Sequence, residues 1–290
     1  MMKARRVAFC FSGQTRTWKY CYPMWKKLMD EFDIEPDVFI HTWDHNTNQQ
    51  RLNTWPDDFQ NCDMVDDMAD YLSTLNPKKY KIDTISVGKS CIKSTTDKIL
   101  KYSPDLQPHQ TVGWMAPQFY SMMYASFLKQ QYEIENSFQY DLVFKFRNDL
   151  VLTEHHINRI MTSNIIPDVL DDQTMYTVHS GSSEVAIAGF ARVGDVFFIA
   201  PSRVYDMICN FYRMIPYIFS MAFDCRGYPP EFYIAYYIKS LHLSFIDMSL
   251  DMTIARTPSY EKNLKNKGLN ILDCDLIIHE KPENSNKPII

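Results

Sequence analysis

The sequence predicts an α/β domain in which a mostly parallel central sheet is flanked by helices, and three observations lead to this prediction. Short apolar runs of strand length, at 5–11, 37–40 and 140–146, alternate with longer segments of helical apolar spacing. Such alternation is typical of parallel strands joined by crossover helices. Several runs end in polar clusters, as strands of open α/β sheets do at a binding edge. Finally, 18 Phe, 18 Tyr and 5 Trp in 290 residues supply the rings for a folded core.

The first elements follow from apolar runs and the loops that end them. Residues 5–11 form the first predicted strand, which ends in the Gly-containing loop 12–16. Residues 18–32 have apolar side chains at helical spacing and predict a helix. A second strand, 37–40, ends in the polar cluster 41–44. Together they predict the β-loop-α-β start of a doubly wound sheet.

Residues 45–110 are polar and interrupted by prolines, so surface loops are predicted for most of this region. One further strand is predicted over 80–87, where Ile82, Ile85 and Val87 are apolar. We expect a mobile segment near 88–112.

The second half of the chain predicts three helices and four strands. Pro117 is expected to open a helix that runs to about Asn136, since proline is tolerated at the first helical position. The next strand, 140–146, ends in the polar cluster 147–150. The remaining predictions are strands at 175–178 and 195–200, a helix at 202–217, a helix from 229–231 to about 241, an edge strand at 244–248 and a frayed polar tail after 281.

Composition and charge exclude several classes of protein. The net charge of −5 does not favour a nucleic-acid binder, which needs a basic face, and no basic amphipathic segment predicts a membrane anchor. No apolar run has the length of a signal peptide or a transmembrane helix. The seven cysteines are odd in number and never spaced C-x-x-C, which argues against a zinc ribbon or a disulfide scaffold. We therefore expect reduced thiols and a cytoplasmic location.

Three predicted strand ends carry polar clusters: 12–16, 41–44 and 147–149. In the first, Gly13 allows close approach of a ligand, Ser12 supplies a hydroxyl, and Arg16 can bind a phosphate. This loop is not a P-loop, and no G-x-G-x-x-G is present. Each cluster alone could be only a turn, but three on neighbouring strands indicate a ligand site.

The third cluster places charges at the end of a buried strand. Lys145, Arg147 and Asp149 must be paired there or must meet a ligand. A diphosphate could bind Arg147 directly or bind a divalent ion on Asp149. The alternative is an internal ion pair between Arg147 and Asp149.

Five segments together resemble a family of GT-A-like glycosyltransferases from bacterial and viral surface-polysaccharide gene sets: FSGQTR, PDVFIHTW, PQFYSMMYASFLKQQYE, YDLVFKFRNDL and RVGDVFFIAPS. The matching pieces span 7–44, 117–152, 175–206 and 229–243, in an order and spacing similar to the family's. The resemblance implies a single GT-A-like domain on a Rossmann-like sheet, with a nucleotide-binding half at 1–150 and an acceptor-binding half at 151–290.

The resemblance also implies a donor site. Ser12, Gly13, Gln14 and Arg16 would lie on the nucleotide, and His41 would close a strand beside Trp43, whose ring can stack on a base or sugar. The family's D-x-D motif holds Mn²⁺ or Mg²⁺ on the donor diphosphate. Here Arg147 replaces its first Asp and only Asp149 remains. Either Asp149 holds the metal, with His279 as a late second ligand, or Arg147 and Lys145 neutralise the diphosphate.

The acceptor side is expected to follow the strand at 195–200. An inverting transfer needs a carboxylate that takes the proton of the acceptor hydroxyl. Glu231, at a helix start, is similar in placement to the family's base, and Asp195 is the other candidate. A purely structural role for Glu231 at the helix N-terminus is an equal alternative.

The implied function is transfer of a sugar from a nucleotide-diphosphate donor to a glycan or glycolipid acceptor, in polysaccharide or lipopolysaccharide synthesis. The alternative is a catalytically inactive nucleotide- or glycan-binding protein on the same fold, which the missing first Asp favours. A sulfotransferase is disfavoured because no phosphosulfate loop is visible.

Overall fold

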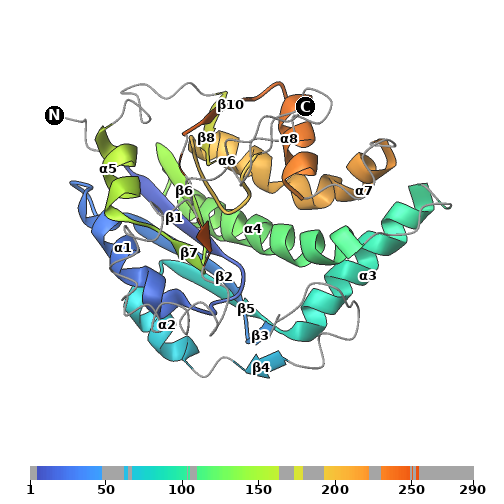
Figure 1. Cartoon of the computed structure of the whole chain (residues 1–290), viewed down its shortest axis with the longest axis horizontal. Helices are drawn as coiled ribbons and strands as arrows, with labels where there is room; N and C mark the ends of the chain where they lie inside the picture. The colour runs from blue at the N-terminus through green and yellow to red at the C-terminus, as the bar shows by residue number, and fades with distance from the viewer. Residues whose placement is uncertain are drawn as a thin grey trace, which may run out of the picture.

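The computed structural model describes residues 5–47, 62–64, 67–102, 104, 110–162, 173–178, 193–221, 230–248, 250 and 253–254. Its centre is a seven-stranded sheet with the order β10-β8-β9-β6-β1-β2-β5 (Figure 1). Only β9 runs antiparallel to its neighbours, so the predicted α/β fold with a mostly parallel sheet is confirmed. The strands are β1 Val7–Ser12, β2 Asp37–Trp43, β5 Lys79–Asp83, β6 Leu142–Arg147, β8 Thr174–Thr177, β9 Phe197–Ala200 and β10 Ser244–Asp247.

Helices cover both faces of this sheet (Figure 1). One face is covered by α1 Trp18–Asp30, α2 Met68–Leu75 and α5 Glu154–Thr162. The other is covered by α4 Gln110–Glu135, α6 Ser202–Cys209, α7 Phe211–Met221 and α8 Pro230–Ser240, with α3 Ile85–Tyr102 packed on α4 and α7. Two short antiparallel pairs complete the described elements: β3 His45–Thr47 with β4 Cys62–Met64, and β7 Leu150–Val151 with β11 Thr253–Ile254.

Strand residues alternate between the two faces. On β6, Phe144 and Phe146 pack toward α1, whereas Val143 packs toward α4 and α6. On β1, Phe9 and Cys10 divide in the same way. Because both faces are buried, the strands are apolar throughout, as the sequence pattern predicted.

Several expected elements differ from the structure. The strand expected at 80–87 ends at Asp83, and helix α3 occupies much of the segment expected to be mobile. Pro117 lies inside α4, whose first residue is Gln110, because Val112 and Met115 are buried in the core and keep the preceding turns helical. The helix expected at 202–217 is two helices, α6 and α7, which meet at Asn210. Helix α2 lies in a region for which mostly surface loops were predicted.

Other expectations concern cysteines and membranes. Cys10, Cys91 and Cys209 are free thiols and buried, and Cys21 is also buried. Among the helices that the structure describes, none is long and apolar enough to cross a membrane. The tail after 281 and His279 lie outside the described residues.

Candidate functional site

The three polar strand ends meet at one edge of the sheet. In the register of the parallel strands, Ser12 lies opposite His41 on one side and opposite Arg147 on the other. The carboxyl ends of β2, β1 and β6 are therefore adjacent, as the sequence predicted. Ser12 is buried, and its hydroxyl donates to the carbonyl of Phe146 over 3.4 Å.

The backbone N–H and carbonyl of Gly13 both form hydrogen bonds. Its N–H donates to the carbonyl of His41 (3.2 Å) and to Ser121 Oγ (2.8 Å), and its carbonyl accepts a hydrogen bond from Asn148 Nδ2 (2.7 Å). The φ of Gly13 is +107°, a conformation that other residues rarely adopt. Asn148 is fully buried and accepts a hydrogen bond from the Tyr71 hydroxyl (2.7 Å). The loop after β1 is thus fixed by β2, α4 and the turn after β6.

Two arginines converge on one carboxylate at this edge. Arg147 binds Asp149 bidentately, with Nε to Oδ1 and Nη2 to Oδ2, both at 3.0 Å. Arg16 Nη1 lies 3.2 Å from Oδ2 of the same carboxylate, and its Nε donates to Gln14 Oε1. The side chain of Asp149 is 2% exposed, while those of Arg16 and Arg147 are 14% and 16% exposed. The internal ion pair that the sequence left open is present, and a second arginine joins it.

His41 and Trp43 lie beneath the edge rather than on it. His41 is fully buried, with Nδ1 2.8 Å from Ser121 Oγ and Nε2 3.0 Å from Asp83 Oδ2. Burial lowers the pKa of His41 below its ordinary value, although Asp83 opposes the shift. Trp43 is buried and packs edge-to-face on His41. Among the described residues, both rings therefore pack beneath the strand ends and support the loop after β1.

Asp83 and Ser121 were not predicted from the sequence. Burial alone would raise the pKa of Asp83, but hydrogen bonds from His41 and Tyr120 lower it to about 2. An ionised Asp83 accepts a hydrogen bond from His41 Nε2. The Ser121 hydroxyl donates to the carbonyl of His41 (3.1 Å), and its oxygen also lies 2.8 Å from His41 Nδ1. Asp83, His41, Ser121 and Gly13 therefore form one chain of hydrogen bonds from β5 to the loop after β1.

The residues expected on the acceptor side lie beside β6. Lys145 is buried, and its Nζ donates to the carbonyls of Asp195 and Val196. The carboxylate of Asp195, which lies just before β9 rather than within it, accepts from the amide of Gln118. The preceding residue, Gly194, packs closely on Val178, because a Cβ there would collide with the Val178 carbonyl. Burial lowers the pKa of Lys145 to about 7.

Glu231 lies in the first turn of α8, and its carbonyl accepts from the N–H of Val193 (3.4 Å). Burial opposes ionisation of Arg147, but the negative charges of Asp149, Asp195 and Glu231 raise its pKa. Both candidate bases thus lie within electrostatic reach of Arg147.

The geometry of Asp149 does not fit a divalent-cation ligand. Both of its oxygens already accept hydrogen bonds from guanidinium groups, and a cation there would face two positive charges. Within the part of the chain that the structure describes, no three His, Cys, Asp or Glu side chains gather as a metal site would require.

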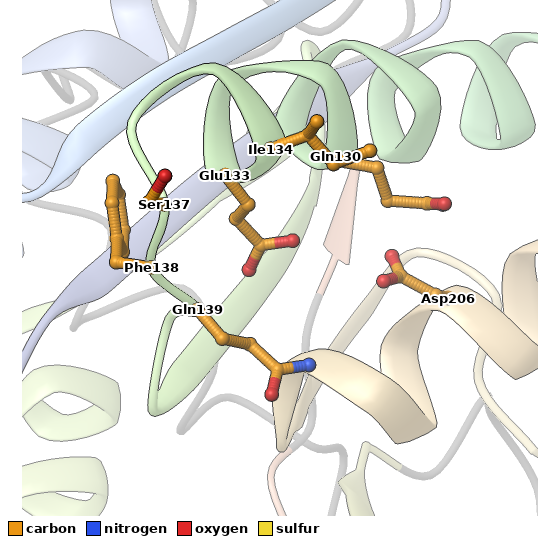
Figure 2. Close-up of a pocket in the computed structure, with 7 residues that line it drawn as sticks. All are labelled: Gln130, Glu133, Ile134, Ser137, Phe138, Gln139 and Asp206. Atoms are coloured by element: carbon orange, nitrogen blue, oxygen red, sulfur yellow. The ribbon is translucent and has the colours of Figure 1, made fainter.

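A surface cavity of about 500 Å³ lies elsewhere, at the end of α4 (Figure 2). The turn at 137–139 that lines it precedes the start of β6, so the cavity is at the opposite edge of the sheet from Arg147. Glu133 and Asp206 face it, and both bind the buried Lys129. None of the side chains predicted for the site lines this cavity.

No family model matches the chain, and a search of curated proteins finds no significant match.

Proposed function

We propose that the protein is a nucleotide-sugar-dependent glycosyltransferase with a GT-A-like fold. One observation carries the proposal: the loop 12–16 and the turn 147–149 meet at the carboxyl edge of neighbouring parallel strands, where Arg16 and Arg147 converge. Open α/β sheets bind ligands at this edge, and paired guanidiniums suit a phosphate group. The donor is a nucleotide-diphosphate sugar, and the acceptor is a glycan or glycolipid in polysaccharide synthesis.

The position of the candidate bases supports a transfer reaction. In an inverting transfer, the acceptor hydroxyl bonds to the anomeric carbon and loses its proton to a carboxylate, while the nucleoside diphosphate leaves with the electron pair of the broken bond. Glu231 and Asp195 are carboxylates on the Arg147 side of the sheet edge. A diphosphate leaving group held by the arginines would therefore depart next to them.

Glu231, which lies in the first turn of α8, is the first candidate base to test. We expect Glu231→Gln to lower the rate of transfer by about 10²–10⁴-fold, the usual contribution of a general base. Nucleotide binding should stay within about twofold, since the residue does not belong to the arginine pair. Asp195→Asn is the matched comparison. If it alone abolishes transfer, the base is Asp195.

The class of donor is tested by thermal shift and by sugar release. The protein is melted with UDP, GDP, CMP and dTDP, and the nucleotide that stabilises it identifies the donor class, since a ligand of the folded state raises stability by RT ln(1 + [L]/Kd). The corresponding nucleotide sugars are then assayed for release of the free nucleotide. Absence of both stabilisation and release across the panel contradicts the proposal.

The replacement of the first D-x-D acid by Arg147 favours one alternative, a binding protein without activity. Stabilisation by a nucleotide without any release from its sugar conjugate, in the presence and absence of Mn²⁺, would support this alternative.

A further inference from the structure

We infer that the protein binds the diphosphate of its ligand through Arg16 and Arg147 without a divalent cation, and that Asp149 is a positioning residue for the two arginines. This inference rests on the proposed function, because it concerns the same edge of the sheet. It reverses the role that the D-x-D position suggests for Asp149.

The hydrogen bonds of Asp149 carry the first step. Arg147 occupies both carboxylate oxygens, and Arg16 shares Oδ2. The carboxylate is almost fully buried, so these contacts are made away from bulk water, where charge-assisted hydrogen bonds are strong. To bind a cation, Asp149 would have to give up at least one guanidinium contact. Its oxygens are used to fix the arginines.

The Nη1 group of Arg147 is the second observation. Among the described residues, Nη1 of Arg147 has no hydrogen-bond partner, although Nε and Nη2 are both engaged. Both arginine side chains keep a small exposed fraction, whereas Asp149 keeps almost none. Asp149 therefore holds the Nε and Nη2 side of the Arg147 guanidinium, which leaves Nη1 to bind a ligand. Planar N–H pairs of this kind match phosphate oxygens.

The local charge carries the third step. Two guanidiniums and one carboxylate leave one net positive charge at the strand end, and the buried Lys145 lies on the same strand. Asp195 and Glu231 balance this charge on the acceptor side. A bound diphosphate would therefore have the arginines on one side and the carboxylates on the other, and this arrangement would fix its orientation. A divalent ion would add a third cation beside the arginines.

Isothermal titration with inorganic pyrophosphate tests the inference on the full chain. The titration is made in a chelator and again with free Mg²⁺ or Mn²⁺ in known excess, corrected for the binding of the metal to pyrophosphate. We expect binding in the chelator and less than a threefold change in Kd with metal. Arg147→Gln should weaken binding at least tenfold. Arg203→Gln, which removes an exposed arginine of α6, should leave it unchanged.

Two further variants distinguish the loss of a phosphate contact from misfolding of the protein. Arg147→Lys keeps the charge but loses the fork, so it should weaken binding less than Arg147→Gln. Asp149→Asn should weaken binding several-fold in chelator and in metal alike, since it loosens the arginines. Circular dichroism melts of each variant show whether it is folded, and Arg16→Gln replaces any Arg147 variant that is not.

Three outcomes would overturn the inference. The first is pyrophosphate binding that requires metal. The second is direct binding of Mn²⁺ to the wild-type protein that Asp149→Asn abolishes. The third is absence of pyrophosphate binding in every condition. In the first two cases the proposed transferase function survives, and in the third it is decided separately by the nucleotide screen and sugar release.

Discussion

The Ser121 hydroxyl connects two strand ends that the chain separates by many residues. It lies 2.8 Å from His41 Nδ1 and accepts the N–H of Gly13 at 2.8 Å. Ser121→Ala leaves both groups buried without this partner, which should lower the free energy of unfolding by about 1–3 kcal/mol. Urea denaturation measures the change. Ser73→Ala, at an exposed position on α2, is the control and should change stability by less than about 0.5 kcal/mol. Equal values for the two variants would contradict the proposed support of the loop.

Lys145 should make stability depend on pH in the neutral range. Burial lowers its pKa in the folded state to about 7, from an ordinary value of 10.5. Above pH 7 the unfolded chain therefore binds more protons at this lysine than the folded protein does, so stability rises with pH. Between pH 7 and 8, below the ordinary pKa of cysteine and tyrosine side chains, the rise from Lys145 should be about 1 kcal/mol.

Lys145→Met should remove this rise. The free energy of unfolding is measured in urea at several pH values for the wild type, for Lys145→Met and for the exposed control Lys98→Met. The control should keep the slope of the wild type. If Lys145→Met keeps it too, Lys145 is charged in the folded protein at neutral pH.

At the scale of single residues, the sequence predicted the charged residues of the site but not the residues that hold them in place. Arg147 and Asp149 are recognisable because charges that end an apolar strand need partners. Ser121, Asp83 and Tyr71 have no such local signal, because their partners lie 42 to 80 residues away in the chain. His41 and Trp43 were expected to touch a ligand, yet their position near the strand end does not reveal that α4 covers them.

At the scale of elements, a buried ionic network joins α4 to α6. Lys129 Nζ lies 2.8 Å from Glu133 Oε2 and 3.1 Å from Asp206 Oδ2, and it also donates to Ser202. Lys129→Met would leave two carboxylates without their cation, and we expect a loss of about 3–5 kcal/mol in urea denaturation. Lys93→Met on α3, whose lysine is 79% exposed, is the matched control and should have little effect.

The loss in Lys129→Met should be smaller at pH 5 than at pH 8. Burial already raises the pKa of Asp206 above its ordinary value, although Lys129 opposes this shift. Without Lys129, the folded state binds a proton at Asp206 more readily than the unfolded chain does, so lower pH restores stability. A loss independent of pH would show that Lys129 stabilises the interface through packing of its aliphatic stem instead.

Elements were predictable where large apolar residues marked them. Strands β1, β2 and β6 were found because their buried faces are rich in Phe, Val and Ile. Helix α3 was missed although its buried residues, Gly88, Cys91, Thr95 and Ile99, recur at helical spacing. Three of these four side chains are small or polar, so the period has little contrast in hydrophobicity. Packing on α4 and α7 stabilises this helix, and that contact cannot be seen locally.

For the whole molecule, the sequence predicted layers but not strand order. Apolar runs on both faces indicate a buried parallel sheet with helices on each side. They do not reveal that β9 inserts antiparallel between β6 and β8, because pairing depends on long-range contacts. This insertion places Asp195, just before β9, beside the end of β6, since Phe146 pairs with Phe197. The acceptor side of the candidate site therefore depends on global topology.

The two core clusters share one sheet, so the molecule should unfold as a single unit. Leu28 on α1 and Ile208 on α6 are both fully buried, on opposite faces. Leu28→Ala and Ile208→Ala should each cost about 2–5 kcal/mol. Because β1 and β6 supply side chains to both clusters, each substitution should lower the whole urea transition, with far-UV dichroism and tryptophan fluorescence coincident. Ile134→Ala, at a side chain 78% exposed, should not shift it. A second transition moved by only one substitution would mean that the faces unfold separately, and the site between β1 and β6 would then lie at a boundary between two units rather than within one.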